Sequence, residues 1–133
     1  MGEIRFSEKS TRPDISYTMH QYYHLSQDPR ASHRDVIIYL VKYLKATRTQ
    51  GITLDTEGKK SFEVYADANF CGNWHQTTAN DNPSTAKSST GYTILYADLP
   101  TIWCIKTQTQ IELSMAEVEY IALYQSVLVN HIK

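Results

Sequence analysis

The sequence predicts a mixed α/β fold, with helices in residues 1–50 and a small antiparallel sheet closed by a helix in residues 51–133. Three patterns support this class. Apolar residues recur at helical spacing in the first part, they alternate with polar residues over 61–70, and a helix start signal opens residues 114–133. A chain of 133 residues with 41% hydrophobic and 20% charged residues is expected to fold around a core.

Two helices are expected in the first part. Pro13 suits the first turn of a helix, and the stretch DISYTMHQYYHL after it keeps helical spacing until Asp28-Pro29 ends it. Ser32, with Asp35 as a near capping box, starts a stronger helix that ends at Gly51. Five residues of this helix are expected to share one apolar face: Val36, Tyr39, Leu40, Tyr43 and Leu44.

The stretch SFEVYADANFCGNW, residues 61–74, contains a predicted strand with one apolar face, packed as a core strand, and one polar face. The GITL stretch before it predicts a short strand, with a turn around residues 55–60. Asp67 lies on the polar face, although aspartate is unfavourable inside strands. Two explanations remain open at this point. The face is simply solvated, which is the commoner case, or the carboxylate is held rigidly to bind a ligand or metal.

A β-hairpin is expected after a polar loop at residues 74–87. Its strands are Gly91–Ala97 and Thr101–Lys106, joined by a tight turn at Asp98-Leu99-Pro100. The final helix begins near Ser114.

Glu119 is a candidate site residue on the final helix. Ser114 and Glu117 form a capping box, so Glu117 already has a structural role. At about 100° per residue, Glu119, Ser126 and Asn130 fall on one narrow polar stripe, and a second polar stripe runs through Glu117. Because a surface helix needs only one stripe toward water, the other suggests a specific contact. Solvation of both stripes is the alternative.

Charge and targeting signals limit the classes of function. The net charge is −1 and the pI is near 6.5, so any contact with nucleic acid must be local or supplied by other domains. The basic residues Lys42, Lys45 and Arg48 lie late in the second helix, where the helix dipole favours cations. No secretory signal or membrane span is evident, and an intracellular location, in cytoplasm or nucleus, is expected.

His20 and His24 are four residues apart, a spacing that suits a zinc pair on a helix. No third ligand is evident in the sequence. A structural or solvated pair is the favoured interpretation.

Five stretches match a known family in order and at compatible spacing: TRPDISYTMHQ, YLVKYLKAT, VYADANFCGNW, STAKSSTGYTILY and LSMAEVEYIAL. Together they resemble the C-terminal part of copia-type long-terminal-repeat retrotransposon polyproteins, in which a ribonuclease H domain follows a reverse transcriptase. The resemblance implies that residues 51–133 form an incomplete ribonuclease H-like fold, a three-stranded antiparallel start with a packed helix. Residues 1–50 would be the helical connection after the reverse transcriptase.

The resemblance also implies roles for individual residues. Asp67 matches the first metal-binding aspartate of the family, and Glu119 matches the glutamate of the first helix, the second ligand. The implied reaction is hydrolysis of RNA in an RNA–DNA hybrid, with Mg²⁺ or Mn²⁺ in a two-metal site. Lys106 and Ser114 match positions near this site and are secondary candidates for substrate contacts.

The sequence departs from the family at Asn69, where a second aspartate is usual, and at Glu112, Met115 and Val118. Family members continue into a strand with a third metal-binding aspartate, and no aspartate follows Glu119 here. With two carboxylates the second metal is poorly held, so the chain alone is expected to be inactive or nearly so. The alternative hypothesis is a non-catalytic module of a decayed nuclease, which binds nucleic acid or self-associates through an open sheet edge.

Overall fold

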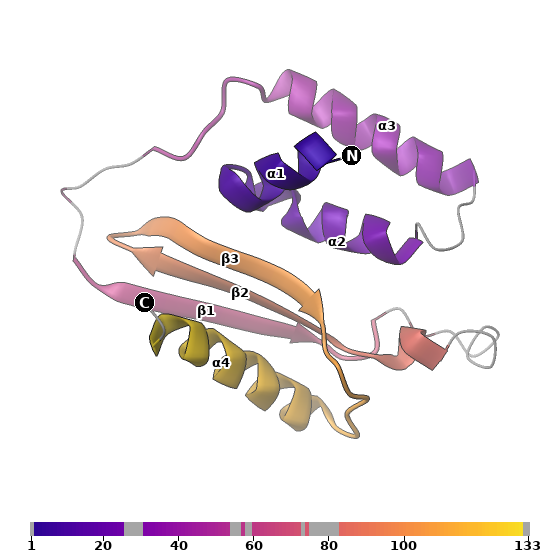
Figure 1. Ribbon diagram of the computed structural model, residues 1–133, viewed down its shortest axis with the longest axis vertical. Coiled ribbons are helices and arrows are strands. Elements are labelled where there is room, and N and C mark those ends of the chain that lie inside the picture. The colour runs from indigo at the N-terminus through magenta and orange to yellow at the C-terminus, as the bar shows by residue number, and fades with distance from the viewer. Residues whose placement is uncertain are drawn as a thin grey trace. The chain divides into compact units, whose positions relative to one another are not determined.

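The computed structural model describes residues 2–25, 31–53, 57, 60–72, 74 and 83–131. The chain divides into two compact units, Met1–Leu54 and Asp55–Lys133, which we call the helical unit and the sheet unit (Figure 1). The described ranges contain four α-helices and one three-stranded antiparallel sheet, which confirms the mixed α/β class. None of the helices in these ranges is long and apolar enough to cross a membrane.

The helical unit contains one helix more than the sequence predicts. Its elements are α1 (Gly2–Ser10), the 3₁₀ turn η1 (Pro13–Ile15), α2 (Ser16–Leu25) and α3 (Ala31–Ala46). Pro13 opens η1, as its position predicts. The prediction misses α1 because this helix contains few apolar residues. Its buried anchor is instead Glu8, which accepts a 2.8 Å hydrogen bond from the hydroxyl of Ser16.

The core of the helical unit is narrow. Ile15, Met19 and Leu40 are buried together, and Ile4 and Leu44 pack against them. The predicted five-residue face of α3 is therefore too wide. Tyr39 is 72% exposed, because only Leu40 and Leu44 of that face pack into the core.

The sheet unit is built from β1 (Phe62–Asn69), β2 (Ser89–Tyr96), β3 (Leu99–Thr107) and α4 (Met115–His131). The strand order is β1-β2-β3, and α4 packs on β1 and β2 (Figure 1). The β2–β3 turn lies at Ala97-Asp98, where both residues have positive φ, as in the favoured two-residue hairpin turns. The predicted turn at residues 98–100 is wrong, because Leu99 and Pro100 already belong to β3.

The predictions for β1 are correct in position and wrong in burial. Phe62 is 62% exposed and Ala66 is also exposed, because β1 is an edge strand and not a core strand. The buried apolar residues of the sheet unit are Ile94, Ala97, Val118 and Ala122. Of the predicted GITL strand, residues 51–53 are described and form no strand. Most of the turn predicted at 55–60 lies outside the described residues.

Candidate functional site

Asp67 is exposed near the end of β1, opposite Gly91 of β2. Neighbouring contacts fix the direction of its side chain. Ala68 pairs with Thr90, and Gln108 Nε2 donates both to Thr90 Oγ1 at 2.7 Å and to the carbonyl oxygen of Val118 in α4 at 3.2 Å. Ala68 and Thr90 therefore point toward α4, and the alternation of strand residues turns Asp67 to the other face of this edge strand.

Glu119 is exposed in the first half of α4. Of the predicted capping box beside it, the cap by Ser114 is confirmed, while the return bond of Glu117 goes to the residue before Ser114. The backbone N–H of Glu117 donates to Ser114 Oγ at 3.3 Å, and Glu117 Oε2 accepts from the backbone N–H of Leu113 at 3.1 Å. Because these bonds occupy Glu117, Glu119 is the glutamate of this helix end that is left for a ligand.

The polar stripe predicted through Glu119 is not one surface. Ser126 has no exposed area, and its hydroxyl donates to the carbonyl oxygen of Leu123 at 2.7 Å within α4. Ser126 thus belongs to the buried row that begins with Val118 and Ala122, while Glu119 faces solvent. The side chain of Asn130 lies outside the described residues.

Asp67 and Glu119 come from two packed elements, β1 and α4. Because Asp67 lies on the face of β1 that is turned away from α4, this packing does not bring its carboxylate to Glu119. In the described part of the chain, no three side chains of His, Cys, Asp and Glu gather in a way that could hold a metal ion. The two carboxylates offer oxygen ligands that suit Mg²⁺, an ion that keeps several of its waters. As protein ligands they would form one half of a two-metal site.

Lys106 and Ser114 lie on different elements. Lys106 is exposed in β3, opposite Thr90 of β2. Ser114 is exposed immediately before α4, and its hydroxyl oxygen caps the helix by accepting the N–H of Glu117. A substrate contact through Ser114 would therefore compete with its capping role.

Gln108, which is absent from the residues predicted for the site, joins the sheet to α4. Gln108 is buried, its backbone N–H donates to the carbonyl oxygen of Ser88 at 2.8 Å, and its side chain bridges Thr90 and Val118. These contacts fix the helix that carries Glu119 on the sheet. No local sequence pattern signals this role of Gln108, because its partner Thr90 is 18 residues away.

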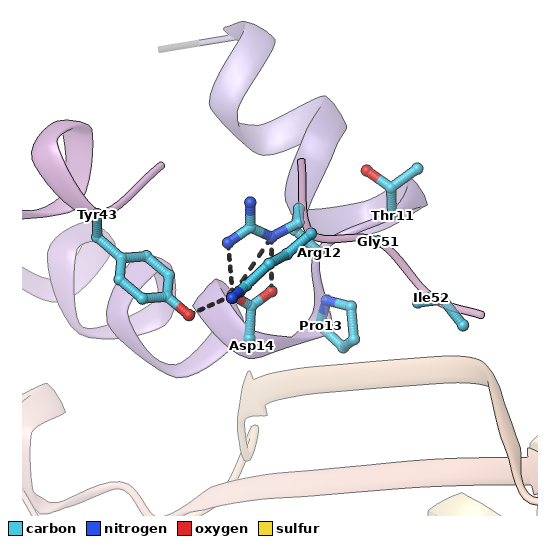
Figure 2. Close-up of a pocket in the computed structure, with 8 residues that line it drawn as sticks. Thr11, Arg12, Pro13, Asp14, Tyr43, Gly51 and Ile52 are labelled. Carbon is cyan, nitrogen blue, oxygen red and sulfur yellow. Dashed lines mark hydrogen bonds and ion pairs between the residues drawn. The ribbon is translucent and has the colours of Figure 1, made fainter. Parts of the chain in front are cut away.

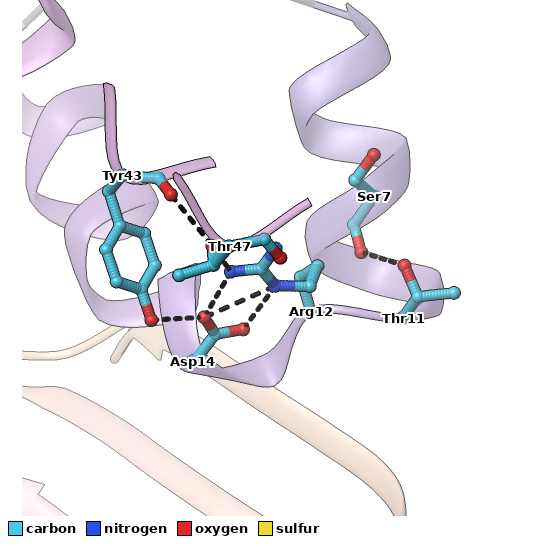
Figure 3. A network of polar contacts seen from close by, with 6 residues as sticks. All are labelled: Ser7, Thr11, Arg12, Asp14, Tyr43 and Thr47. Atoms are coloured by element: carbon cyan, nitrogen blue, oxygen red, sulfur yellow. Dashed lines mark hydrogen bonds and ion pairs between the residues drawn. The ribbon is translucent and has the colours of Figure 1, made fainter. Parts of the chain in front are cut away.

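Arg12 forms a second polar network, in the helical unit (Figure 3). Its guanidinium donates to Asp14 Oδ1 and Oδ2 at 2.9 and 2.7 Å, and to the side-chain and backbone oxygens of Thr47 at 2.8 and 3.2 Å. The hydroxyl of Tyr43 donates to Asp14 at 2.8 Å. The bonds from Arg12 lower the pKa of Asp14, and the bond from Tyr43 adds to this effect. The network ties η1 to the end of α3.

A shallow pocket of about 230 Å³ opens beside this network (Figure 2). Arg12, Asp14 and Tyr43 point toward one another at its wall, so their charges and donors are largely satisfied within the protein. The pocket is therefore a structural feature around an ion pair. It is lined by Thr11, Arg12, Pro13, Asp14, Tyr43, Gln50, Gly51 and Ile52.

The rings of His20 and His24 meet edge to face, with their centroids 4.8 Å apart. Burial lowers the pKa of His20, and the nearby His24 and Lys9 act in the same direction. A neutral, half-buried histidine packed against a second ring fits the structural interpretation of this pair.

The chain is similar over most of its length to proteins of transposons. It is 30% identical over 110 residues to the retrovirus-related Pol polyprotein from transposon RE1 of Arabidopsis thaliana, which covers 83% of this chain and 7% of that polyprotein. It is 28% identical over 129 residues to a putative transposon Ty5-1 protein of Saccharomyces cerevisiae, which covers 96% of this chain and 39% of that protein. The chain is thus related to retrotransposon Pol polyproteins. It corresponds to a short segment of them.

A further relative is the secreted RxLR effector protein 161 of Plasmopara viticola, at 25% identity over 126 residues, which are 95% of this chain and 82% of that protein. No protein-family model matches the chain. No solved structure matches it significantly.

Proposed function

We propose that the chain is the start of the ribonuclease H region of a copia-type retrotransposon polyprotein, with the helical connection before it. In this proposal the sheet unit is an incomplete ribonuclease H-like fold, and Asp67 and Glu119 bind Mg²⁺ or Mn²⁺ for hydrolysis of RNA in RNA–DNA hybrids. One observation carries it. In a chain related to Pol polyproteins, one exposed carboxylate lies on β1 and another on the helix that packs on β1.

The chemistry needs more than these two groups. Two divalent ions about 3.5–4 Å apart activate the attacking water and stabilise the leaving oxygen in phosphodiester cleavage. Asp67 points to the face of β1 away from α4, so binding of one ion by both Asp67 and Glu119 needs a change in this arrangement, and the described residues provide no third acidic ligand. We therefore expect weak binding of one metal ion by this chain and little or no cleavage of a hybrid.

Substitution of either carboxylate should weaken Mg²⁺ binding. Asp67→Asn and Glu119→Gln keep the shape of the side chains and remove the charge, so each is expected to reduce Mg²⁺ affinity by about tenfold or more. The measurement is a titration of the whole 133-residue chain with Mg²⁺, followed by amide NMR shifts.

Two matched controls separate a site from a general acidic surface. Glu63→Gln changes a carboxylate on the same strand face as Asp67, and Glu117→Gln changes one two residues from Glu119 while glutamine preserves the capping box. Both control variants should bind Mg²⁺ as the unaltered chain does. The assignment is wrong if the two site variants retain full affinity, or if the controls lose as much.

A non-catalytic interaction module is the second candidate. It is favoured by the edge of β1, which pairs with no further strand among the described residues, and by exposed apolar residues of α4, among them Tyr120 and Leu123. An unpaired strand edge beside an apolar helix is a common site of self-association. Light scattering should then show a molar mass that rises with concentration and falls with Leu123→Lys. A constant monomer mass would exclude self-association as the role of this module.

A further inference from the structure

The two units carry charge of opposite sign. Residues 1–54 contain eight Lys and Arg against five Asp and Glu, a formal net charge of +3. Residues 55–133 contain five against nine, a formal net charge of −4. The total of −1 hides this division. A positive unit in a nearly neutral chain suggests a polyanionic partner for that unit.

Much of the positive charge lies along one side of α3. Arg34, Lys42 and Lys45 belong to the helix, Arg48 lies in the turn after it, and all four are exposed. At about 100° per residue, the three helical residues fall within an arc of about 80°, which lies on the far side from the buried Leu40. We call these four residues the basic face of α3.

Local structural roles account for only part of the basic face. The helix dipole favours cations at the C-terminal end of α3, but it disfavours Arg34 near the N-terminal end. In the described part of the chain none of the four forms an ion pair or a hydrogen bond, and the ion pairs of this unit use Lys9 and Arg12 instead. Asp35 is the single acidic residue of α3. The four cations are therefore available to a partner.

The dimensions of the basic face suit a phosphate backbone. Arg34 and Lys45 are eleven residues apart in α3, which corresponds to about 16 Å along the helix. A nucleic-acid duplex presents one negative charge per about 1.7 Å of its axis, so each of the four cations can meet a different phosphate. The exposed Ile38 and Val41 lie between the cations and carry no opposing charge.

We propose that the basic face of α3 binds the phosphate backbone of a nucleic-acid duplex, without reading its sequence. This assigns nucleic-acid binding to the helical unit, apart from the carboxylates of the sheet unit. It rests on the proposed function only for the choice of an RNA–DNA hybrid as the probe. The binding needs no metal ion, because the contacts are direct ion pairs with phosphates.

The test is fluorescence anisotropy, in which the whole chain is titrated into a labelled RNA–DNA hybrid in the presence of EDTA. The titration is repeated at several salt concentrations between about 50 and 200 mM. Four phosphate contacts predict a slope of log K against log salt of about −3.6. The combined variant Arg34→Ala, Lys42→Ala and Lys45→Ala should reduce the slope to about −0.9 and abolish most of the binding. Circular dichroism checks that the variant keeps its helices, as expected for exposed positions that accept alanine.

Lys9→Ala is the matched control. It removes one positive charge from the same unit, at a lysine that is already paired with Glu8. The control should bind the hybrid with an unchanged slope. Unchanged binding by the combined variant, or binding that does not depend on salt, would overturn the proposal. So would binding of a polyglutamate peptide in place of the hybrid, since that result assigns the basic face to an acidic protein.

The metal-site variants separate this inference from the proposed function. Asp67→Asn and Glu119→Gln should leave hybrid binding in EDTA intact, because neither residue belongs to the basic face. Loss of binding in these variants would contradict the inference. If both variants also bind Mg²⁺ normally, the metal site fails while the basic face stands.

Discussion

Ile94→Ala is expected to lower the free energy of unfolding of the sheet unit by about 2–5 kcal/mol. Ile94 is 1% exposed in β2, the central strand, and it pairs with Val64 of β1 and Ile102 of β3. It lies four residues from Thr90 on the same strand face, so its side chain points toward α4. Truncation would leave a cavity between the sheet and the helix, in a unit with few fully buried side chains.

The measurement is hydrogen exchange of the whole chain, which reports the opening of each unit separately. Ile94→Val is a graded control with an expected cost of about 0.5–1.5 kcal/mol. Ile111→Ala, at an exposed isoleucine of the same unit, should change stability by less than about 0.5 kcal/mol. Exchange in the helical unit should not change. An Ile94→Ala cost as small as that of Ile111→Ala would show that α4 does not cover β2.

Local patterns in the sequence predicted most of the elements and few of the burial details. The alternation over residues 61–70 located β1, but it could not show that β1 is an edge strand, because strand order depends on contacts distant in sequence. The turn at Ala97-Asp98 was misplaced, since Asp98-Leu99-Pro100 has the composition of a turn while alanine is an unusual residue for positive φ.

At the candidate site, too, the sequence shows local contacts and not those between residues distant in sequence. The capping box was visible because Ser114 and Glu117 are three residues apart, and it identified Glu119 as the free glutamate of the helix start. The hydrogen bonds through Gln108 were not visible in the sequence, because its partner Thr90 is 18 residues away. Likewise, Asp14 and Tyr43 are 29 residues apart in the sequence, so no local pattern predicts the hydrogen bond between them.

Glu112 marks a place where the structure shows a physical cost. Its side chain lies in the segment between β3 and α4 and the residue is 5% exposed. In the described part of the chain neither carboxylate oxygen has a hydrogen-bond partner. A buried carboxylate without a hydrogen-bond partner loses its hydration and forms no interaction that replaces it, so it destabilises the fold.

Glu112→Ala is therefore expected to stabilise the sheet unit, by about 1–3 kcal/mol, the usual cost of a buried polar group without a partner. Urea denaturation followed by hydrogen exchange measures the change. Glu112→Gln separates charge from shape, since the amide removes the charge and keeps the volume, and it should give a smaller gain. Glu119→Ala, at an exposed glutamate, should change stability by less than about 0.5 kcal/mol. A loss of stability in Glu112→Ala would mean that this carboxylate has a partner, and Glu112 would then join the residues that hold α4 on the sheet.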